Sequence, residues 1–250
     1  MVRLRDMSHV HIDRVEFASA GGTVRGLYYS IEGVRTCVVL CHGYSSSKHN
    51  VDPLAFHLAA DGYAALAFDF LGHKLGASSG PLREGADLVA NALDACSAAR
   101  HREGIEHLVI GGHSMGAATA IGAAVANPDI EGVIAMATST GRSRQLTDDT
   151  MLSGLRNRTA YVEGADPDSI TAAMDRYTDR VGDVAPRPIL VIAAQRDALV
   201  PPSAVRRLFD EAREPKTFEV VDANHTDCAE RSRFVITRWL GSRGFPSTQQ

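Results

Sequence analysis

The fold is decided by His107-Leu-Val-Ile-Gly-Gly-His-Ser-Met-Gly-Ala117. An apolar run from Leu108 to Ile110 enters a glycine-rich turn, and small residues from Ala117 to Ala126 follow as a predicted helix. A strand, a tight turn and a helix, with Ser114 at the tip, form the context that the G-x-S-x-G nucleophile elbow requires. The alternative is a glycine-rich turn in another kind of α/β protein.

The glycines around Ser114 have a physical reason. A nucleophile at the apex of a strand-to-helix turn adopts a strained backbone conformation. Side chains two positions before or after it would clash, so Gly112 and Gly116 are expected there. The helix that begins beside Ser114 also points backbone N–H groups toward the reacting centre.

The composition is ordinary for a soluble globular protein. The chain has 250 residues, of which 44% are hydrophobic and 22% charged, and its net charge is −4. This length fits one large α/β domain with an insertion better than two domains. The absence of a basic patch argues against a nucleic-acid partner. Because no apolar stretch reaches the ~20 residues of a membrane span, we expect no membrane association. The residues from Met1 to Asp13 lack an apolar segment, so no signal peptide is expected.

The four cysteines form neither a C-x-x-C pair nor a metal-binding spacing; they are Cys37, Cys41, Cys96 and Cys228. We interpret them as reduced, partly buried thiols of a cytoplasmic protein. No His/Asp/Glu cluster has ligand spacing either, so we expect no metal and no cofactor.

The predicted elements alternate between strand and helix after an N-terminal hairpin. The hairpin comprises 10–18 and 23–31 around Gly21-Gly22. Buried strands are predicted over 36–41, 63–70, 108–110, 132–138, 189–194 and 217–221, and helices over 51–61, 82–102, 117–126, 203–212 and 231–240. This alternation predicts a parallel, doubly wound sheet whose carboxyl strand ends share one edge. Active sites of open α/β sheets lie at that edge.

The segment 141–185 departs from this alternation. It is rich in charged residues and contains no buried strand, although helices near 147–156 and 168–181 fit its pattern. We interpret it as an inserted helical cap between two core segments, 1–140 and 186–250, because long excursions in compact domains are often lids. The alternative is an ordinary surface excursion. Residues 241–250 are expected to form a frayed tail.

A serine nucleophile needs a base and a carboxylate that orients the base. His225 is the predicted base because it follows a late strand in a short polar loop. Asp197, three residues after Ala194, is the predicted carboxylate. Asp222 competes with it, but we expect Asp222 to stabilise the His225 loop. The order Ser114, Asp197, His225 matches the order of this architecture.

A tetrahedral oxyanion needs preorganised donors. We expect the backbone N–H groups of Met115, which follows the nucleophile, and of Tyr44, which follows the first buried strand. The Tyr44 ring either lines the acyl pocket or simply packs. Gly43 and His113, which adjoin these donors, are predicted to contact the substrate.

Five motifs together resemble the α/β-hydrolase superfamily over about residues 24–240. They are Cys41-His-Gly-Tyr44, Asp69-Phe-Leu-Gly-His-Lys-Leu-Gly-Ala-Ser78, Gly112-His-Ser-Met-Gly116, Asp197-Ala-Leu-Val-Pro201 and Asn224-His225. Within the superfamily the chain resembles small capped bacterial esterases of the feruloyl/cinnamoyl-esterase and serine-aminopeptidase-like group. Many relatives have Arg where this chain has Leu71 or His73.

The resemblance implies a fold and a set of roles. The fold is a mostly parallel eight-stranded sheet with helices on both faces and a small helical cap. Ser114 is implied as nucleophile, His225 as base, Asp197 as orienting acid, and the amides of Tyr44 and Met115 as oxyanion hole.

The leading functional hypothesis is a cofactor-free carboxylesterase (EC 3.1.1) that cleaves a small-molecule ester through an acyl-enzyme on Ser114. We expect a monomer or homodimer. A thioesterase is the next alternative, a peptidase or C–C bond hydrolase is less favoured, and an acyltransferase would use the same groups with an alcohol or amine in place of water. A non-catalytic ligand-binding protein on this fold is a different class of function.

Overall fold

The sheet is the centre of the fold. A computed structural model describes residues 9–141 and 157–248. It contains an eight-stranded sheet in the order β1-β2-β4-β3-β5-β6-β7-β8. The strands are β1 (His11–Ser19), β2 (Gly22–Ser30), β3 (Thr36–Cys41), β4 (Ala64–Phe68), β5 (His107–His113), β6 (Gly132–Met136), β7 (Ile189–Ala194) and β8 (Lys216–Val221). The predicted hairpin forms the antiparallel edge β1–β2, and β2 pairs with β4 antiparallel. The other neighbours, in the order β4-β3-β5-β6-β7-β8, pair in parallel. The predicted fold class is therefore confirmed.

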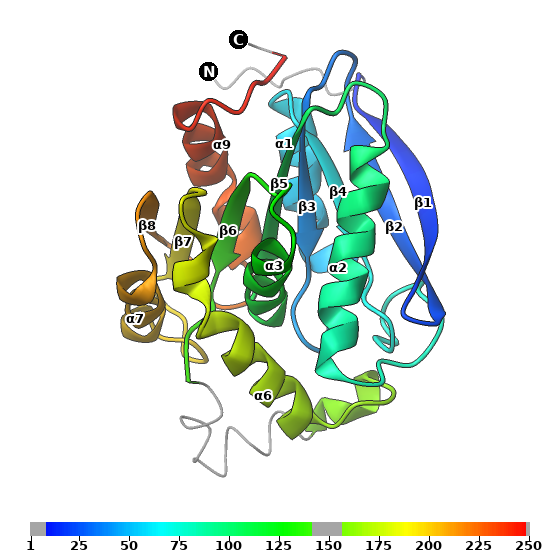
Figure 1. The fold of residues 1–250 in the computed structure, drawn as a ribbon, viewed down its shortest axis with the longest axis vertical. Coiled ribbons are helices and arrows are strands. Elements are labelled where there is room, and N and C mark those ends of the chain that lie inside the picture. The colour runs from blue at the N-terminus through cyan, green and yellow to red at the C-terminus, as the bar shows by residue number, and fades with distance from the viewer. Residues whose placement is uncertain (1–8, 142–156, 249–250) are drawn as a thin grey trace.

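Helices cover both faces of the sheet (Figure 1). One face carries α2 (Gly85–Arg100), α3 (Met115–Ala126), α6 (Pro167–Thr178) and α7 (Pro202–Glu211), and the other carries α1 (Asp52–Ala60), α8 (Cys228–Arg231) and α9 (Arg233–Ser242). Every residue of β3, β4, β6 and β7 is buried. In β3, Val39 faces the first layer and Val38 the second. Burial on both faces explains why these strands are continuous apolar runs rather than alternating ones.

The second predicted helix of the cap is α6, and it packs on the core. Ile170 and Met174 belong to the same apolar cluster as α2 and α3. A Cβ on Gly85 would lie 2.2 Å from Ala173 Cβ, which shows how closely α2 approaches α6. Figure 1 shows α6 crossing below α2 and α3. The division into core and cap stays a prediction, and the helix predicted near 147–156 lies outside the described residues.

Residues 161–165 form a ribbon along the loop that follows β4. Val162 makes an antiparallel bridge with His73. The N–H of Lys74 donates to the carbonyl oxygen of Tyr161, and that of Glu163 donates to Gly72, each at 2.9 Å. These bonds fasten the ribbon to the edge of the sheet where Ser114 lies.

The prediction of a frayed C-terminus is wrong for residues 241–248. Phe245 is buried and packs beside Trp239 in the second core layer. Thr36 Oγ1 donates to the carbonyl oxygen of Pro246 at 2.8 Å, and the N–H of Thr248 donates to Gly62 at 3.1 Å. The tail is otherwise polar, so its sequence did not indicate that Phe245 would anchor it to the core.

Among residues 9–141 and 157–248, no helix has the length and apolar character needed to cross a membrane.

The substitution Phe245→Ala tests the anchor. It should lower the free energy of unfolding by about 3 kcal/mol, because it removes a buried aromatic side chain and leaves a cavity. The matched substitution Phe234→Ala removes a ring that is 69% exposed, so it should change stability by less than about 0.5 kcal/mol. Urea unfolding measures both, and equal effects would contradict the anchoring role.

Candidate active site

Ser114 occupies a strained turn between β5 and α3. Its φ of 56° and ψ of −115° are uncommon for a residue with a side chain. A Cβ on Gly112 would lie 2.2 Å from the carbonyl oxygen of Gly116, and one on Gly116 would lie 2.3 Å from that of Cys41. Neither position has room for a side chain, as the sequence predicted. The Ser114 N–H donates to the carbonyl oxygen of Met136 at 2.9 Å, which ties the turn to β6.

The structure brings Asp197 and His225 together from the loops after β7 and β8. His225 Nδ1 donates to Asp197 Oδ2 at 2.7 Å. The other oxygen, Oδ1, accepts the N–H groups of Leu199 and Val200, each at 2.8 Å. Burial raises the pKa of the Asp197 carboxyl, but the bonds from His225, Val200 and Leu199 outweigh it and hold the pKa below its ordinary value. A proton held on Nδ1 leaves the Nε2 lone pair of His225 available as a base.

His113 holds the backbone of the His225 loop. Its Nε2 donates to the carbonyl oxygen of His225 at 2.7 Å, and the two rings lie 4.7 Å apart. The His113 side chain is 4% exposed. The predicted substrate contact of His113 stays a prediction, whereas its contact with the His225 loop was missed, because the pairing joins residues 112 positions apart.

The His225 loop is closed mainly by its own polar side chains. Asp227 Oδ1 accepts the N–H of Asn224 at 2.7 Å, and Asn224 Oδ1 accepts that of Thr226 at 2.8 Å. Asp222 instead forms an ion pair with Arg196 of the loop after β7. Asp222 therefore acts between two loops, rather than within the His225 loop as the sequence suggested.

The loop after β3 lies directly against the elbow. A Cβ on Gly43 would lie 3.6 Å from Ser114 Cβ and 3.3 Å from His113 Nδ1. Tyr44 follows Gly43, and Met115 begins α3, whose first N–H groups have no acceptor within the helix. The Tyr44 and Met115 amides therefore belong to segments that adjoin Ser114. Their role as oxyanion donors, and the substrate contact of Gly43, stay predictions.

A buried ion pair links the loop after β3 to the loop after β4. Lys48 Nζ lies 2.6 Å from Asp69 Oδ2, and the Lys48 N–H donates to Asp69 Oδ1 at 2.7 Å. The N–H of Ala77 also donates to Oδ2 at 2.7 Å. Burial raises the pKa of the Asp69 carboxyl, but the bonds from Lys48 and Ala77 bring it below its ordinary value. Sequence reasoning missed this pair, which joins the loop after the first predicted buried strand to the end of the second.

Two neutral histidines fill the space beside this pair. His42 Nε2 accepts a hydrogen bond from the N–H of Phe70 at 3.1 Å, and His42 Nδ1 donates to the carbonyl oxygen of Gly43 at 2.8 Å. The rings of His42 and His73 lie 4.9 Å apart. Burial lowers the pKa of His42 to about 3 and that of His73 to about 4. Both therefore stay uncharged at neutral pH and serve the architecture of the loops.

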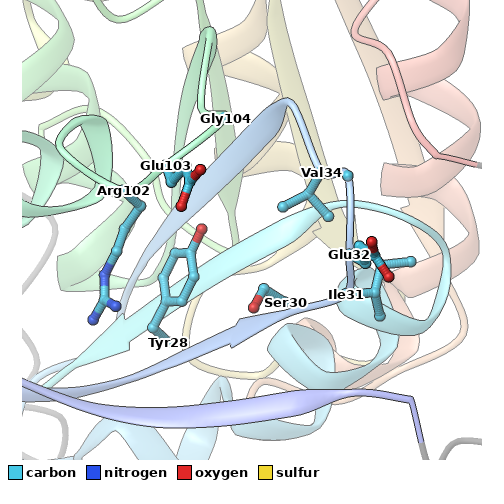
Figure 2. A pocket seen from close by; sticks show the side chains of 9 residues that line it. Tyr28, Ser30, Ile31, Glu32, Val34, Arg102, Glu103 and Gly104 are labelled. Atoms are coloured by element: carbon cyan, nitrogen blue, oxygen red, sulfur yellow. The ribbon is translucent and has the colours of Figure 1, made fainter.

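A separate hollow of about 490 Å³ does not include the residues of this site. Figure 2 shows the side chains that line it. It is lined by Tyr28, Ser30, Ile31, Glu32, Gly33, Val34, Arg102, Glu103 and Gly104. These residues belong to β2 and to the connections that lead into β3 and β5, so they lie at the opposite edge of the sheet from Ser114. None of the nine is a histidine, which leaves its serine without a base. In the part of the chain that the structure describes, no cluster of three or more His, Cys, Asp or Glu could hold a metal.

Comparison with known proteins identifies the family. Residues 32–162, more than half of the chain, match the family model described as "Serine aminopeptidase, S33". The chain belongs to this family of α/β hydrolases. A search of curated proteins finds no match.

Solved structures agree with this fold. An acetyl xylan esterase from Paenibacillus sp. R4 is 18% identical, with a TM-score of 0.73 over 96% of this chain and 86% of that one. The α/β hydrolase GrgF from Penicillium sp. sh18 is 18% identical, with a TM-score of 0.70 over 92% and 97%. The Pyrococcus furiosus esterase Pf2001 is 22% identical, with a TM-score of 0.67 over 95% and 91%. At these identities the likeness shows the fold, and the family places the chain among hydrolases.

The substitution Gly116→Ala tests the packing of the elbow. It should lower the free energy of unfolding by at least about 2 kcal/mol, because backbone atoms of β3 and α3 must separate to admit the new methyl group. Gly182→Ala is the matched control, since its Cβ would meet nothing closer than 3.4 Å. Thermal melts of both variants measure the difference, and an unchanged melt for Gly116→Ala would contradict the close approach.

The buried histidines predict a pH dependence of stability. Their folded-state pKa values lie below those of the unfolded chain, so the unfolded state binds more protons between about pH 6.5 and 4. The contribution of these two histidines to the free energy of unfolding is therefore fully present above pH 6.5. It falls as the pH is lowered through this window, by about 1 kcal/mol per pH unit for each histidine.

Urea unfolding at pH 7, 6, 5 and 4.5 measures this slope. His73→Asn should flatten it, whereas His101→Asn, at an exposed position, should leave it unchanged. A slope that is the same in all three proteins would show that His73 is not held neutral.

Proposed function

We propose that the protein is a serine esterase that cleaves a small-molecule carboxylic ester through an acyl-enzyme on Ser114. The observation that carries the proposal is the 2.7 Å bond between His225 and Asp197 at the sheet edge where Ser114 occupies its strained turn. A hydroxyl is a weak nucleophile until an oriented base removes its proton, and this arrangement supplies the base and its orienting group.

The proposed reaction has two halves. Ser114 Oγ attacks the acyl carbon while His225 Nε2 takes the hydroxyl proton, and the amides of Tyr44 and Met115 stabilise the oxyanion. Collapse of this intermediate breaks the bond to the alkoxide, which receives the proton from His225. Water then attacks the acyl-enzyme with His225 again as base, and the acid leaves as Ser114 recovers its proton. Asp197 stabilises the imidazolium formed in both halves.

The comparisons favour an ester over the alternatives. The Paenibacillus and Pyrococcus structures are named esterases. A peptide substrate is the second candidate, because the family model is described as a serine aminopeptidase. A thioester would use the same groups, and an acyltransferase would differ only in the acceptor of the acyl group.

Ser114→Ala tests the nucleophile. It should abolish labelling by a fluorophosphonate probe and the hydrolysis of phenyl esters, because no other hydroxyl replaces Oγ at the elbow. Asp197→Asn should keep the fold but lower kcat by about 10⁴, because the imidazole loses its orienting charge. Labelling that survives Ser114→Ala would overturn the proposal.

A substrate panel separates the alternatives. The panel compares phenyl esters, matched thioesters and aminoacyl anilides. We expect kcat/KM to be highest for the phenyl esters. Product analysis with added methanol reveals any transfer of the acyl group. A wild-type protein that neither labels nor cleaves any activated ester would support a non-catalytic binding function instead.

A further inference from the structure

We propose that Arg158 makes this site selective for esters that carry a carboxylate. The inference rests on the proposed esterase function and identifies its class of substrate. The carboxylate belongs either to the acyl part or to the alcohol part of the ester, and the experiment below distinguishes the two.

Arg158 is held over the loop that adjoins the nucleophile. Its Nη1 donates to Ser45 Oγ at 3.2 Å. Ser45 is the residue after Tyr44, whose amide is the proposed oxyanion donor. The chain that follows Arg158 enters the ribbon fastened to Gly72 and Lys74 by backbone bonds. The guanidinium therefore lies at the edge of the sheet where the substrate must enter.

Within residues 9–141 and 157–248, the charge of Arg158 is not matched by a carboxylate. Arg83 pairs with Asp87 and Arg180 with Asp183, whereas no carboxylate of the described residues lies within ion-pair distance of Arg158. A guanidinium has five N–H donors in a fork that matches a carboxylate, and the bond to Ser45 uses one of them. The remaining donors can bind an anionic group of the substrate.

The hydroxyl of Tyr44, which belongs to the same loop as Ser45, is a second donor. It is buried and has no hydrogen-bond partner within the described residues. A buried hydroxyl without a partner is unfavourable, so a ligand oxygen that accepts its proton would be stabilised there. A carboxylate accepts bonds from both a hydroxyl and a guanidinium.

Asp166 is the opposing charge near Tyr44. Burial is the main cause that raises the pKa of the Tyr44 hydroxyl, and the negative charge of Asp166 raises it further. Asp166 precedes α6 and caps its N-terminus, where its Oδ1 accepts the N–H of Ser169 at 2.9 Å. An anionic substrate is therefore attracted by Arg158 and repelled by Asp166, and the two residues should affect its binding in opposite directions.

Pairs of esters, one with a carboxylate and one without, test the selectivity. Monophenyl adipate carries a carboxylate in the acyl part and is compared with phenyl hexanoate. Acetoxybenzoate carries one in the alcohol part and is compared with phenyl acetate. Arg158→Gln should lower kcat/KM for one of the anionic esters by about tenfold, chiefly through KM, and change its neutral counterpart by less than twofold.

Three further variants control the result. Arg158→Lys keeps the charge and should lose less than Arg158→Gln. Asp166→Asn keeps the helix cap and should raise kcat/KM for the same anionic ester about two- to threefold, an increase that damage to the fold could not produce. Arg207→Gln removes the same charge from an exposed arginine of α7 and should leave the ratio of anionic to neutral turnover unchanged.

The outcomes separate this inference from the function on which it rests. Neutral esters cleaved equally by all variants, with no change in the anionic ratio for Arg158→Gln, would overturn the role of Arg158 and leave the esterase proposal standing. Wild-type protein that cleaves neutral esters but neither anionic ester would do the same. Failure of the wild type to react with any ester or fluorophosphonate would overturn both.

Discussion

The close approach of three backbone segments at Ser114 is the constraint on which the site depends. Gly112 of β5, Gly116 of α3 and Cys41 of β3 meet at distances that leave no room for a Cβ. This contact forces Ser114 into positive φ and places its side chain beyond the strand end. The turn is strained, and the buried strands on both sides of β5 supply the packing that maintains it.

Polar contacts then position the loops that surround the turn. The Lys48–Asp69 pair ties the loop after β3 to the loop after β4, and His42 fills the space beside it in neutral form. A buried ion pair of this kind adds little net stability compared with an apolar contact, but removal of one partner is costly. Its value here is geometric, because it restrains the segment that contains Gly43 and Tyr44. On the other side of the turn, His113 restrains the His225 loop in a similar way.

The parts that sequence reasoning predicted well are those with local physical causes. Continuous apolar runs indicated the strands of the parallel sheet, and the glycine spacing around Ser114 indicated the elbow. The parts that it missed involve pairs distant in the chain. In the sequence, Phe245 is a single aromatic residue in a polar tail, and only the structure shows that it packs beside Trp239. The sequence predicted the second helix of the segment 141–185, but it did not indicate the close contact of that helix with α2 through Gly85 and Ala173.

The sequence by itself determined the order of strands and helices, the strained serine, and the candidates Asp197 and His225, because backbone strain, strand burial and strand-end loops leave local patterns. Only the tertiary structure decided that His225 bonds Asp197, that Asp222 bonds Arg196 instead, and that Arg158 lies on Ser45. The physical reason is that each of these contacts depends on which loops the sheet order brings together. A side chain's charge can be read from the chain, but its partner is set by the fold.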